Sequence, residues 1–380
     1  MRFTQTPHNS VLLLKYSIAV LAAVVGGSAR AQPETPMIKE ISVQLVCPLT
    51  GPNSKVPGLM KRLDICGADL GIMTEADGRI FFAFGDTFGY PCSGPGGPNW
   101  RSNTLGATAD HNPGNGIALT EWLTNPDGKA KAIIQGAHQP PFTGTDGEQT
   151  KIPTSMVTVG GRIYLHYMSV HGFAAKGGVW DCNYSQFLYS DDMGKTWTLA
   201  TVKFGDNTSN FNMLALTDEN GSGNEFTRYV YAIGTPCGRF GDAKLGRVLK
   251  ENVLDPSAWE YYVAGQDPAH SWTPNRLAAS MIIPAPIGEG SILWDRWMHR
   301  WLFTYLNEDT AQIELREAEN PWGPWSVPIA LATAQQFPQL YGAFMTPSFL
   351  RDSGKSLYFV MSMFGPYQAF LMKAELQTYQ

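Results

Sequence analysis

Residues 79–86 read Arg79-Ile-Phe-Phe-Ala-Phe-Gly-Asp86, and this pattern decides the fold because it recurs four more times. A basic residue after a turn precedes a run of apolar and aromatic residues, and a small polar residue stands seven positions after the basic one. Such runs are typical of buried strands. The other copies are Arg162-IYLHYM-Ser169, Arg228-YVYAIG-Thr235, Arg300-WLFTYL-Asn307 and Lys355-SLYFVM-Ser362.

Each copy is flanked by two further strand candidates. The preceding apolar segments are residues 70–73, 156–159, 213–216, 291–294 and 344–350, which predicts a hairpin with each copy. The following candidates are residues 116–122, 187–189, 245–249, 313–316 and 370–374. No run longer than a few residues has a convincing helical period, so we predict an all-β chain. Repeated groups of strands predict a five-bladed β-propeller in a single domain over residues 32–380. A pair of β-sandwiches is the alternative, but it does not explain why five copies share the same spacing between the basic and the polar residue.

A local motif supports the propeller independently. Ser190-Asp-Asp192-Met-Gly194-Lys-Thr196-Trp197 fits S-x-D-x-G-x-T-W. It resembles the Asp-box of sialidase-like propellers, in which the carboxylate satisfies turn amides and the glycine allows a positive φ. The motif marks the fold rather than a catalytic site.

The first 31 residues predict a signal peptide. Arg2 is followed by the apolar stretch Tyr16–Val25 and by Ala29-Arg30-Ala31, a small-x-small cleavage pattern. We expect cleavage before Gln32, export to the periplasm or the medium, and no stable membrane insertion. An uncleaved anchor is the alternative.

Charge and cysteine content narrow the functional classes. Lys plus Arg number 28 against 33 Asp plus Glu, a net charge of −5 without a basic stripe, which argues against nucleic-acid binding. The chain has five cysteines and no C-x-x-C pair. Export favours one or two disulfides, whose pairing the sequence leaves open. No H-E-x-x-H arrangement is present, so we predict no metal, and we expect a monomer.

Two aspartates stand out once the propeller is assumed. Equivalent strand positions then meet at one mouth of the ring, where Asp86 is the only carboxylate of the five seventh positions. Asp69 lies in the preceding strand, and a turn at residues 76–79 would bring it beside Asp86. Paired carboxylates suit glycoside hydrolysis, which needs one protonated and one ionised group. The alternative is that both merely satisfy backbone amides of a tight hairpin.

Residues 67–89, 100–105 and 151–169, together with the Asp-box, closely resemble an exported propeller family long called domain of unknown function 4185. This family is associated with the endo-D-arabinanases of glycoside hydrolase family 183. The resemblance implies a cofactor-free, five-bladed enzyme that cleaves internal α-D-arabinofuranosyl linkages of mycobacterial arabinogalactan and lipoarabinomannan. It also implies that Asp69 and Asp86 are the paired catalytic aspartates. Which of them donates the proton stays open.

Further residues are candidates for binding the polysaccharide. Arg101 and Asn103 follow the Asp86 strand, Glu289 precedes an inner strand, and aromatic residues offer stacking surfaces. The substrate-binding candidates are Trp100, Arg101, Asn103, Glu289, Asn307 and Tyr341, with Trp180 and Trp272 as further stacking candidates. Alternatives for the function are a glycosidase acting on arabinan, arabinoxylan or a sialoside, and a non-catalytic glycan-binding propeller.

Overall fold

The computed structural model describes residues 37–92, 94–205, 209–218, 225–265, 267 and 271–379. The predicted signal peptide lies outside these residues. Among the residues described, no helix is long and apolar enough to cross a membrane.

The five hairpins that the repeat predicts are all present. Each repeat copy forms or enters the second strand of a hairpin: β3 (Arg79–Phe88), β7 (Arg162–Phe173), β11 (Tyr229–Thr235), β17 (Arg300–Asn307) and β21 (Ser356–Met363). Each pairs antiparallel with the strand before it: β2 (Gly67–Ala76), β6 (Thr150–Val159), β10 (Met213–Thr217), β16 (Gly290–Asp295) and β20 (Leu340–Arg351).

The third strands match the expectation in four of the five copies. These are β8 (Trp180–Ser190), β12 (Gly241–Leu249), β18 (Gln312–Ala318) and β22 (Gln368–Thr378). In the first copy the third strand is instead β4 (Thr104–Thr108), and the expected segment 116–122 contributes only β5 (Glu121–Trp122). Small residues suit β4 because Gly106 packs directly against the Trp122 ring. The remaining outer strands are β9 (Thr198–Phe204), β13 (Glu260–Tyr262), β14 (Trp272–Thr273), β15 (Met281–Ile287) and β19 (Ile329–Thr333).

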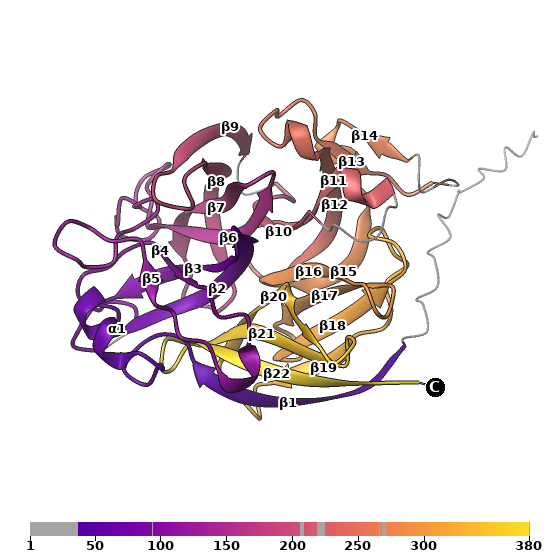
Figure 1. The fold of residues 1–380 in the computed structure, drawn as a ribbon. Helices are drawn as coiled ribbons and strands as arrows, with labels where there is room; N and C mark the ends of the chain where they lie inside the picture. The colour runs from indigo at the N-terminus through magenta and orange to yellow at the C-terminus, as the bar shows by residue number, and fades with distance from the viewer. Residues whose placement is uncertain are drawn as a thin grey trace, which may run out of the picture. The chain divides into compact units, whose positions relative to one another are not determined.

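The sheets form a closed ring. Hydrogen bonding defines four sheets in the described chain, and the largest joins two groups through the single parallel pair Ala68↔Gln368. Dividing that sheet at this pair gives five groups of strands. The first strands β2, β6, β10, β16 and β20 contact one another in a circle, each touching the next and β20 touching β2. Figure 1 shows these strands around the centre of the molecule. The fold is therefore the predicted all-β, five-bladed propeller.

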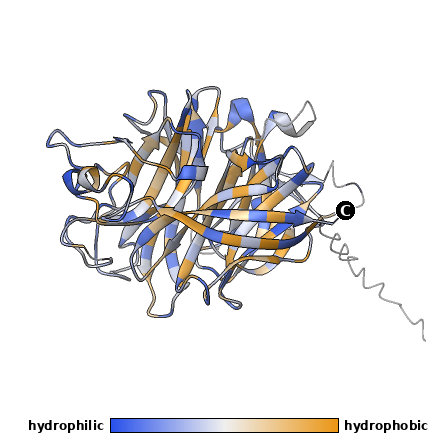
Figure 2. Ribbon diagram, turned by 60° about the horizontal axis from the view of Figure 1, so that its bottom comes forward, coloured by the Kyte–Doolittle hydropathy of each residue, from blue (hydrophilic) through white to orange (hydrophobic). Residues whose placement is uncertain are grey.

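The ring is closed by β1 (Ile38–Pro48), which is the outer strand of the last blade. It runs antiparallel to β22, from Ile38↔Thr378 to Pro48↔Phe370. Hydrophobic and hydrophilic residues both occur along the strands in Figure 2. The second strands are buried along almost their full length, as expected for sheets that pack on neighbouring blades with both faces, whereas the outer strand β9 (Thr198–Phe204) alternates between buried and exposed residues.

The helices are short and were not expected from the sequence. The α-helix α1 (Pro57–Leu63) buries Met60 and Leu63 and has Asp64 as its C-cap, and its seven residues are too few to give a helical period. Among the described residues the 3₁₀ helices are η1 (Pro113–Asn115), η2 (Glu225–Arg228), η3 (Lys250–Asn252) and η5 (Arg276–Ala278).

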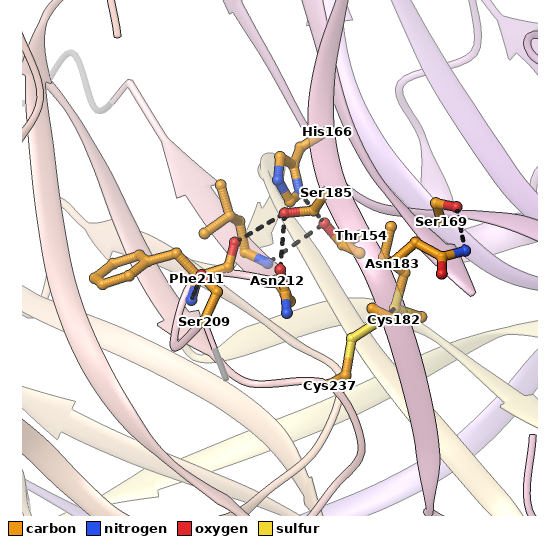
Figure 3. Close-up of a disulfide and its surroundings, with 12 residues drawn as sticks. Thr154, His166, Ser169, Cys182, Asn183, Ser185, Ser209, Phe211, Asn212 and Cys237 are labelled. Carbon is orange, nitrogen blue, oxygen red and sulfur yellow. Dashed lines mark hydrogen bonds between the residues drawn. A yellow bond between two sulfur atoms is a disulfide. The ribbon is translucent and has the colours of Figure 1, made fainter. Parts of the chain in front are cut away.

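Four of the five cysteines form two disulfides. Cys66 pairs with Cys92 and Cys182 with Cys237, while Cys47 is a buried thiol. The second bridge joins β8 of the second blade to the segment after β11 of the third (Figure 3).

The Asp-box forms the turn between β8 and β9. Asp192 accepts hydrogen bonds from Ser190 Oγ (2.8 Å), Thr196 N (2.8 Å) and Thr196 Oγ1 (2.7 Å). These bonds lower the pKa of Asp192 to about 2. Gly194 has a φ of +78° and leaves no room for a side chain against Leu105 of the first blade. The turn thereby packs against the neighbouring blade.

We predict that Asp192→Ala lowers the free energy of unfolding by about 1–2 kcal/mol, because it removes these turn hydrogen bonds. Asp191→Ala is the matched control. It breaks only an exposed ion pair with Arg162 and should leave the free energy of unfolding nearly unchanged. Urea unfolding at neutral pH measures both, and equal losses would contradict the role given to Asp192.

Candidate active site

A β-bulge positions the two aspartates. The pairs Ala68↔Thr87 and Leu70↔Phe84 leave Asp69 of β2 opposite two residues of β3, Gly85 and Asp86. Leu70 has a φ of +64°, an uncommon conformation for a branched side chain, and its amide is held by Ser362 Oγ at 2.8 Å. Bulges of this kind redirect side chains next to active sites.

Glycine at position 85 is required by the Asp69 carboxylate. A Cβ atom at Gly85 would collide with Asp69 Oδ1 and with the Leu70 side chain. The missing side chain therefore lets Asp69 lie over the backbone next to Asp86.

Asp69 is surrounded by tyrosines from the last blade. Tyr341 of β20 donates its hydroxyl to Asp69 Oδ2 at 2.7 Å, and Tyr367, in the turn between β21 and β22, also favours the ionised carboxylate. Asp69 Oδ1 is screened from solvent and has no hydrogen-bond partner among the residues described. Burial raises the pKa of Asp69 to about 7, and the negative charge of Glu289 contributes in the same direction.

Asp86 receives its hydrogen bonds from the loop after β3 and from the second blade. Trp100 Nε1 and Thr150 Oγ1 both donate to Oδ1, each at 2.6 Å. The residue is 7% exposed. Burial raises the pKa of Asp86 to about 8 despite these donors, and the charge of Asp69 adds to the increase. The two carboxylates therefore interact, and near neutral pH their shared environment favours one proton on the pair.

Arg239 extends the site towards the third and fourth blades. Its guanidinium binds both oxygens of Glu289 (2.8 and 2.9 Å) and Glu308 Oε1 (2.6 Å), and it lies 5.1 Å from the centre of the Tyr341 ring. Burial opposes its charge, but the two glutamates outweigh this effect and raise the pKa of Arg239. The Cys182–Cys237 disulfide anchors the segment just before it.

Exposed phenylalanines stand in loops at the same ends of the second strands. Phe142 is 44% exposed and its amide binds His171 O of β7, Phe240 (38%) follows β11, and Phe364 (51%) follows β21. We refer to these three as the rim phenylalanines. Apolar side chains exposed around a polar site are suited to binding a ligand with apolar faces.

The predicted site residues fall into two sets. Trp100 and Tyr341 contact the aspartates directly through hydrogen bonds, and Glu289 lies near Asp69 and is bound to Arg239. Trp180 also lies beside Arg239, whose guanidinium is 5.6 Å from its ring.

The other predicted residues hold the scaffold. Arg101 is 5% exposed and donates to the Asp64 carbonyl at 2.7 Å, and burial lowers its pKa to about 10. Asn103 is fully buried, and both ends of its amide bind backbone groups of Ile134 and Lys151. Asn307 binds Glu314 and the amides of its own turn, and Trp272 packs against Tyr231 and Tyr262 of the third blade.

Three contributors escape the sequence analysis: Thr150, Tyr367 and Arg239. Thr150 opens the second blade, and the other two lie in connections between strands, outside the repeat. The nearest signal for Arg239 is Cys237, two positions earlier. In the part of the chain that the structure describes, no three His, Cys, Asp or Glu side chains are grouped to hold a metal.

Comparison with known proteins identifies the family. The family model described as "Domain of unknown function (DUF4185)" matches residues 56–373, so the chain belongs to this family. No curated protein sequence matches the chain.

Two solved structures share the fold at low sequence identity. A "putative hydrolase" from Bacteroides ovatus ATCC 8483 superposes with a TM-score of 0.59 at 15% identity, covering 90% of this chain and 93% of its own. The exo-β-1,3-galactanase of Phanerochaete chrysosporium, solved with β-1,3-galactotriose, has a TM-score of 0.51 at 9% identity, covering 89% of this chain and 67% of its own.

We predict that Asp69→Asn and Asp86→Asn each stabilise the protein at pH 8. The native pKa values lie above the unfolded value near 4, so the native state binds protons more tightly and loses stability as the pH rises from about 4 to 8. A neutral asparagine avoids this loss. We expect a gain of about 1–3 kcal/mol at pH 8 that shrinks towards pH 4.

Denaturant unfolding at the two pH values provides the measurement. Asp192→Asn is the matched control, because its depressed pKa predicts a loss of stability at pH 8 instead. If the Asp69 and Asp86 variants also lose stability at pH 8, the two carboxylates are compensated in the native protein and the prediction is wrong.

Proposed function

We propose that this member of the DUF4185 family is a glycoside hydrolase in which Asp69 and Asp86 are the catalytic carboxyl groups. One observation carries the proposal: the half-buried Asp69 and the buried Asp86 interact on one hairpin, and their pKa values are raised to about 7 and about 8. Such a pair supplies one protonated and one ionised carboxyl group near neutral pH. The fold shared with an exo-galactanase is consistent with this chemistry.

The hydrogen bonds favour Asp86 as the acid. Both side-chain donors engage Asp86 Oδ1, which leaves Oδ2 for a proton directed at the leaving oxygen. Asp69 receives tyrosine hydroxyls, which stabilise its ionised form. In the proposed step, water attacks the anomeric carbon while Asp69 takes a proton from it, and the C–O bond breaks as Asp86 protonates the leaving oxygen.

A catalytic role is also favoured over a purely structural one. The hydrogen bonds to the two carboxylates come from Tyr341, Thr150 and Trp100 side chains, rather than from amides of the hairpin turn at residues 77–78. The bulge and the conformation of Leu70 serve to orient Asp69, which a simple hairpin does not require.

For the substrate we propose a neutral furanoside polysaccharide, with endo-cleavage of α-D-arabinofuranosyl linkages as in family 183. The resemblance described above supports this choice, and the rim phenylalanines supply apolar surfaces for sugar rings. A sialoside is disfavoured because Arg239 is already bound by two glutamates and Arg101 is buried against Asp64. Arabinan and arabinoxylan are the alternative substrates.

We further propose that the protein is exported. The sequence of residues 1–31 supports a cleavable leader, and two disulfides are suited to an oxidising compartment.

The central prediction is that mature protein releases arabino-oligosaccharides from purified mycobacterial arabinogalactan, and that Asp69→Asn and Asp86→Asn each lower turnover roughly 100-fold or more. Asp77→Asn is the matched control, because Asp77 lies on the same hairpin with a side chain 77% exposed. Near-normal turnover of folded Asp86→Asn would exclude its role as the acid.

A second prediction concerns pH. Tyr341→Phe removes a donor to Asp69, so it should raise the pKa of Asp69 and move the acidic limb of the kcat/KM profile to higher pH by about one unit. Glu289→Gln removes a negative charge and should move the same limb to lower pH. Shifts of both variants in one direction would contradict the assignment of Asp69 as the ionised group.

A further inference from the structure

The mouth of the ring opposite the aspartates opens into a cavity of about 600 Å³. Asp69 lies near the beginning of β2, whereas Glu75 lies at its far end and lines this cavity. The ends of β6, β10, β16 and β20 complete the walls, so all five blades contribute. A cavity of this size accommodates a small ligand. We refer to it as the second mouth.

The charges lining the second mouth are balanced. Glu75 and Asp218 are its carboxylates and Arg296 is its guanidinium, among the lining residues that the structure describes. Lys250 lies 3.8 Å from Asp218 and offsets the second negative charge. Balanced charges give no preference for an anion or a cation and therefore favour a neutral polar ligand.

Groups that contact a sugar well are available there. Trp297 is 38% exposed, although the Arg296 guanidinium lies 4.3 Å from the centre of its ring and covers one face of the indole. An exposed indole is a platform for the apolar face of a sugar ring. The Ser348 hydroxyl is screened from solvent and has no hydrogen-bond partner in the described part of the chain. A ligand whose hydroxyl groups both donate and accept hydrogen bonds would supply the partner that the Ser348 hydroxyl lacks.

The carboxylate of Glu75 is held in place rather than mobile. Its Oε1 atom accepts hydrogen bonds from Thr346 Oγ1 at 2.7 Å and from Ser348 N at 3.1 Å. A carboxylate fixed at the wall is ready to accept hydrogen bonds from sugar hydroxyls without first losing side-chain freedom.

Another cavity, of about 620 Å³ between the first and second blades, is a weaker candidate. Its Arg79 guanidinium is bound to both oxygens of Glu121 at 3.1 Å and to Asp77 at 3.8 Å. Three of its four charged lining residues, Arg79, Glu121 and Asp77, are therefore paired with one another, and the second mouth is the stronger candidate.

We propose that the second mouth is a binding site for a neutral oligosaccharide, which holds a segment of polysaccharide away from the bond that is cleaved. Trp297 would stack on a sugar ring, while Ser348, Glu75 and Arg296 bind its hydroxyls. The choice of an arabinan-type sugar rests on the proposed function, whereas the presence of a neutral-glycan site does not.

Affinity electrophoresis through gels containing arabinogalactan, arabinan or arabinoxylan tests the site. The Asp69→Asn/Asp86→Asn double variant serves as the parent, so that the gel polysaccharide stays intact. Trp297→Ala and Ser348→Ala are added to it separately, with Leu199→Ala as a matched control, since Leu199 is 54% exposed on β9. Thermal unfolding checks that every variant is folded. Ser348→Ala should leave stability unchanged because its hydroxyl makes no hydrogen bond.

We expect Trp297→Ala to weaken retardation roughly tenfold and Ser348→Ala to weaken it in the same gel, with Leu199→Ala unchanged. Phe364→Ala, at the catalytic mouth, should add to the effect of Trp297→Ala as an independent site. Retardation that is unaffected by Trp297→Ala, or absent for the parent in every gel, would overturn the site. Oligosaccharide release by wild type is assayed separately. If the protein is inactive but its retardation depends on Trp297, the proposed hydrolase activity is wrong and the proposed glycan-binding site stands.

Discussion

Two interacting carboxylates on one hairpin, Asp86 buried and Asp69 half-buried, are the constraint from which the rest of the site follows. Their charges repel, and burial removes the water that would otherwise screen them. The protein meets this constraint with donors from other blades: Thr150 from the second, and Tyr341 and Tyr367 from the fifth. These donors reach the aspartates only when the blades are packed in a ring. The fold and the chemistry therefore depend on each other, because an open arrangement of the same blades would leave the pair without its partners.

Charged residues of the third and fourth blades lie beside the aspartate pair. Arg239 is bound by two glutamates and packs beside the ring of Tyr341, so a net negative cluster borders Asp69. This negative charge raises the pKa of Asp69, so the aspartate pair keeps a proton at a pH at which isolated carboxyl groups have lost theirs. The same cluster repels anionic ligands, which is consistent with neutral glycans as the substrate class.

The repeat was sufficient to predict the fold, because five copies of one strand pattern indicate five equivalent blades. The polar residue seven positions after each basic residue marks the same end of each second strand. It failed for β4, whose small residues lack an apolar run, while Ile117 and Leu119 nearby are buried in a loop. Repeat register led to Asp86, and hairpin geometry led to Asp69. Arg101 and Asn103 were chosen because they follow Asp86 along the chain. Yet their side chains bind backbone groups, since the direction of a loop residue depends on tertiary packing. Arg239 and Tyr367 lie outside the repeat and could not be found from it.

The pairing of β1 with β22 places the first and last strands of the described chain in one blade. During synthesis β22 is made last, so the ring stays open until translation of the domain is complete. Contacts between such distant segments slow folding, because a long loop must close before they form. For a chain that crosses a membrane unfolded, this delay is an advantage: the polypeptide does not become a closed, compact body before it has passed through. The position of one outer strand thus makes the timing of folding compatible with the export proposed above.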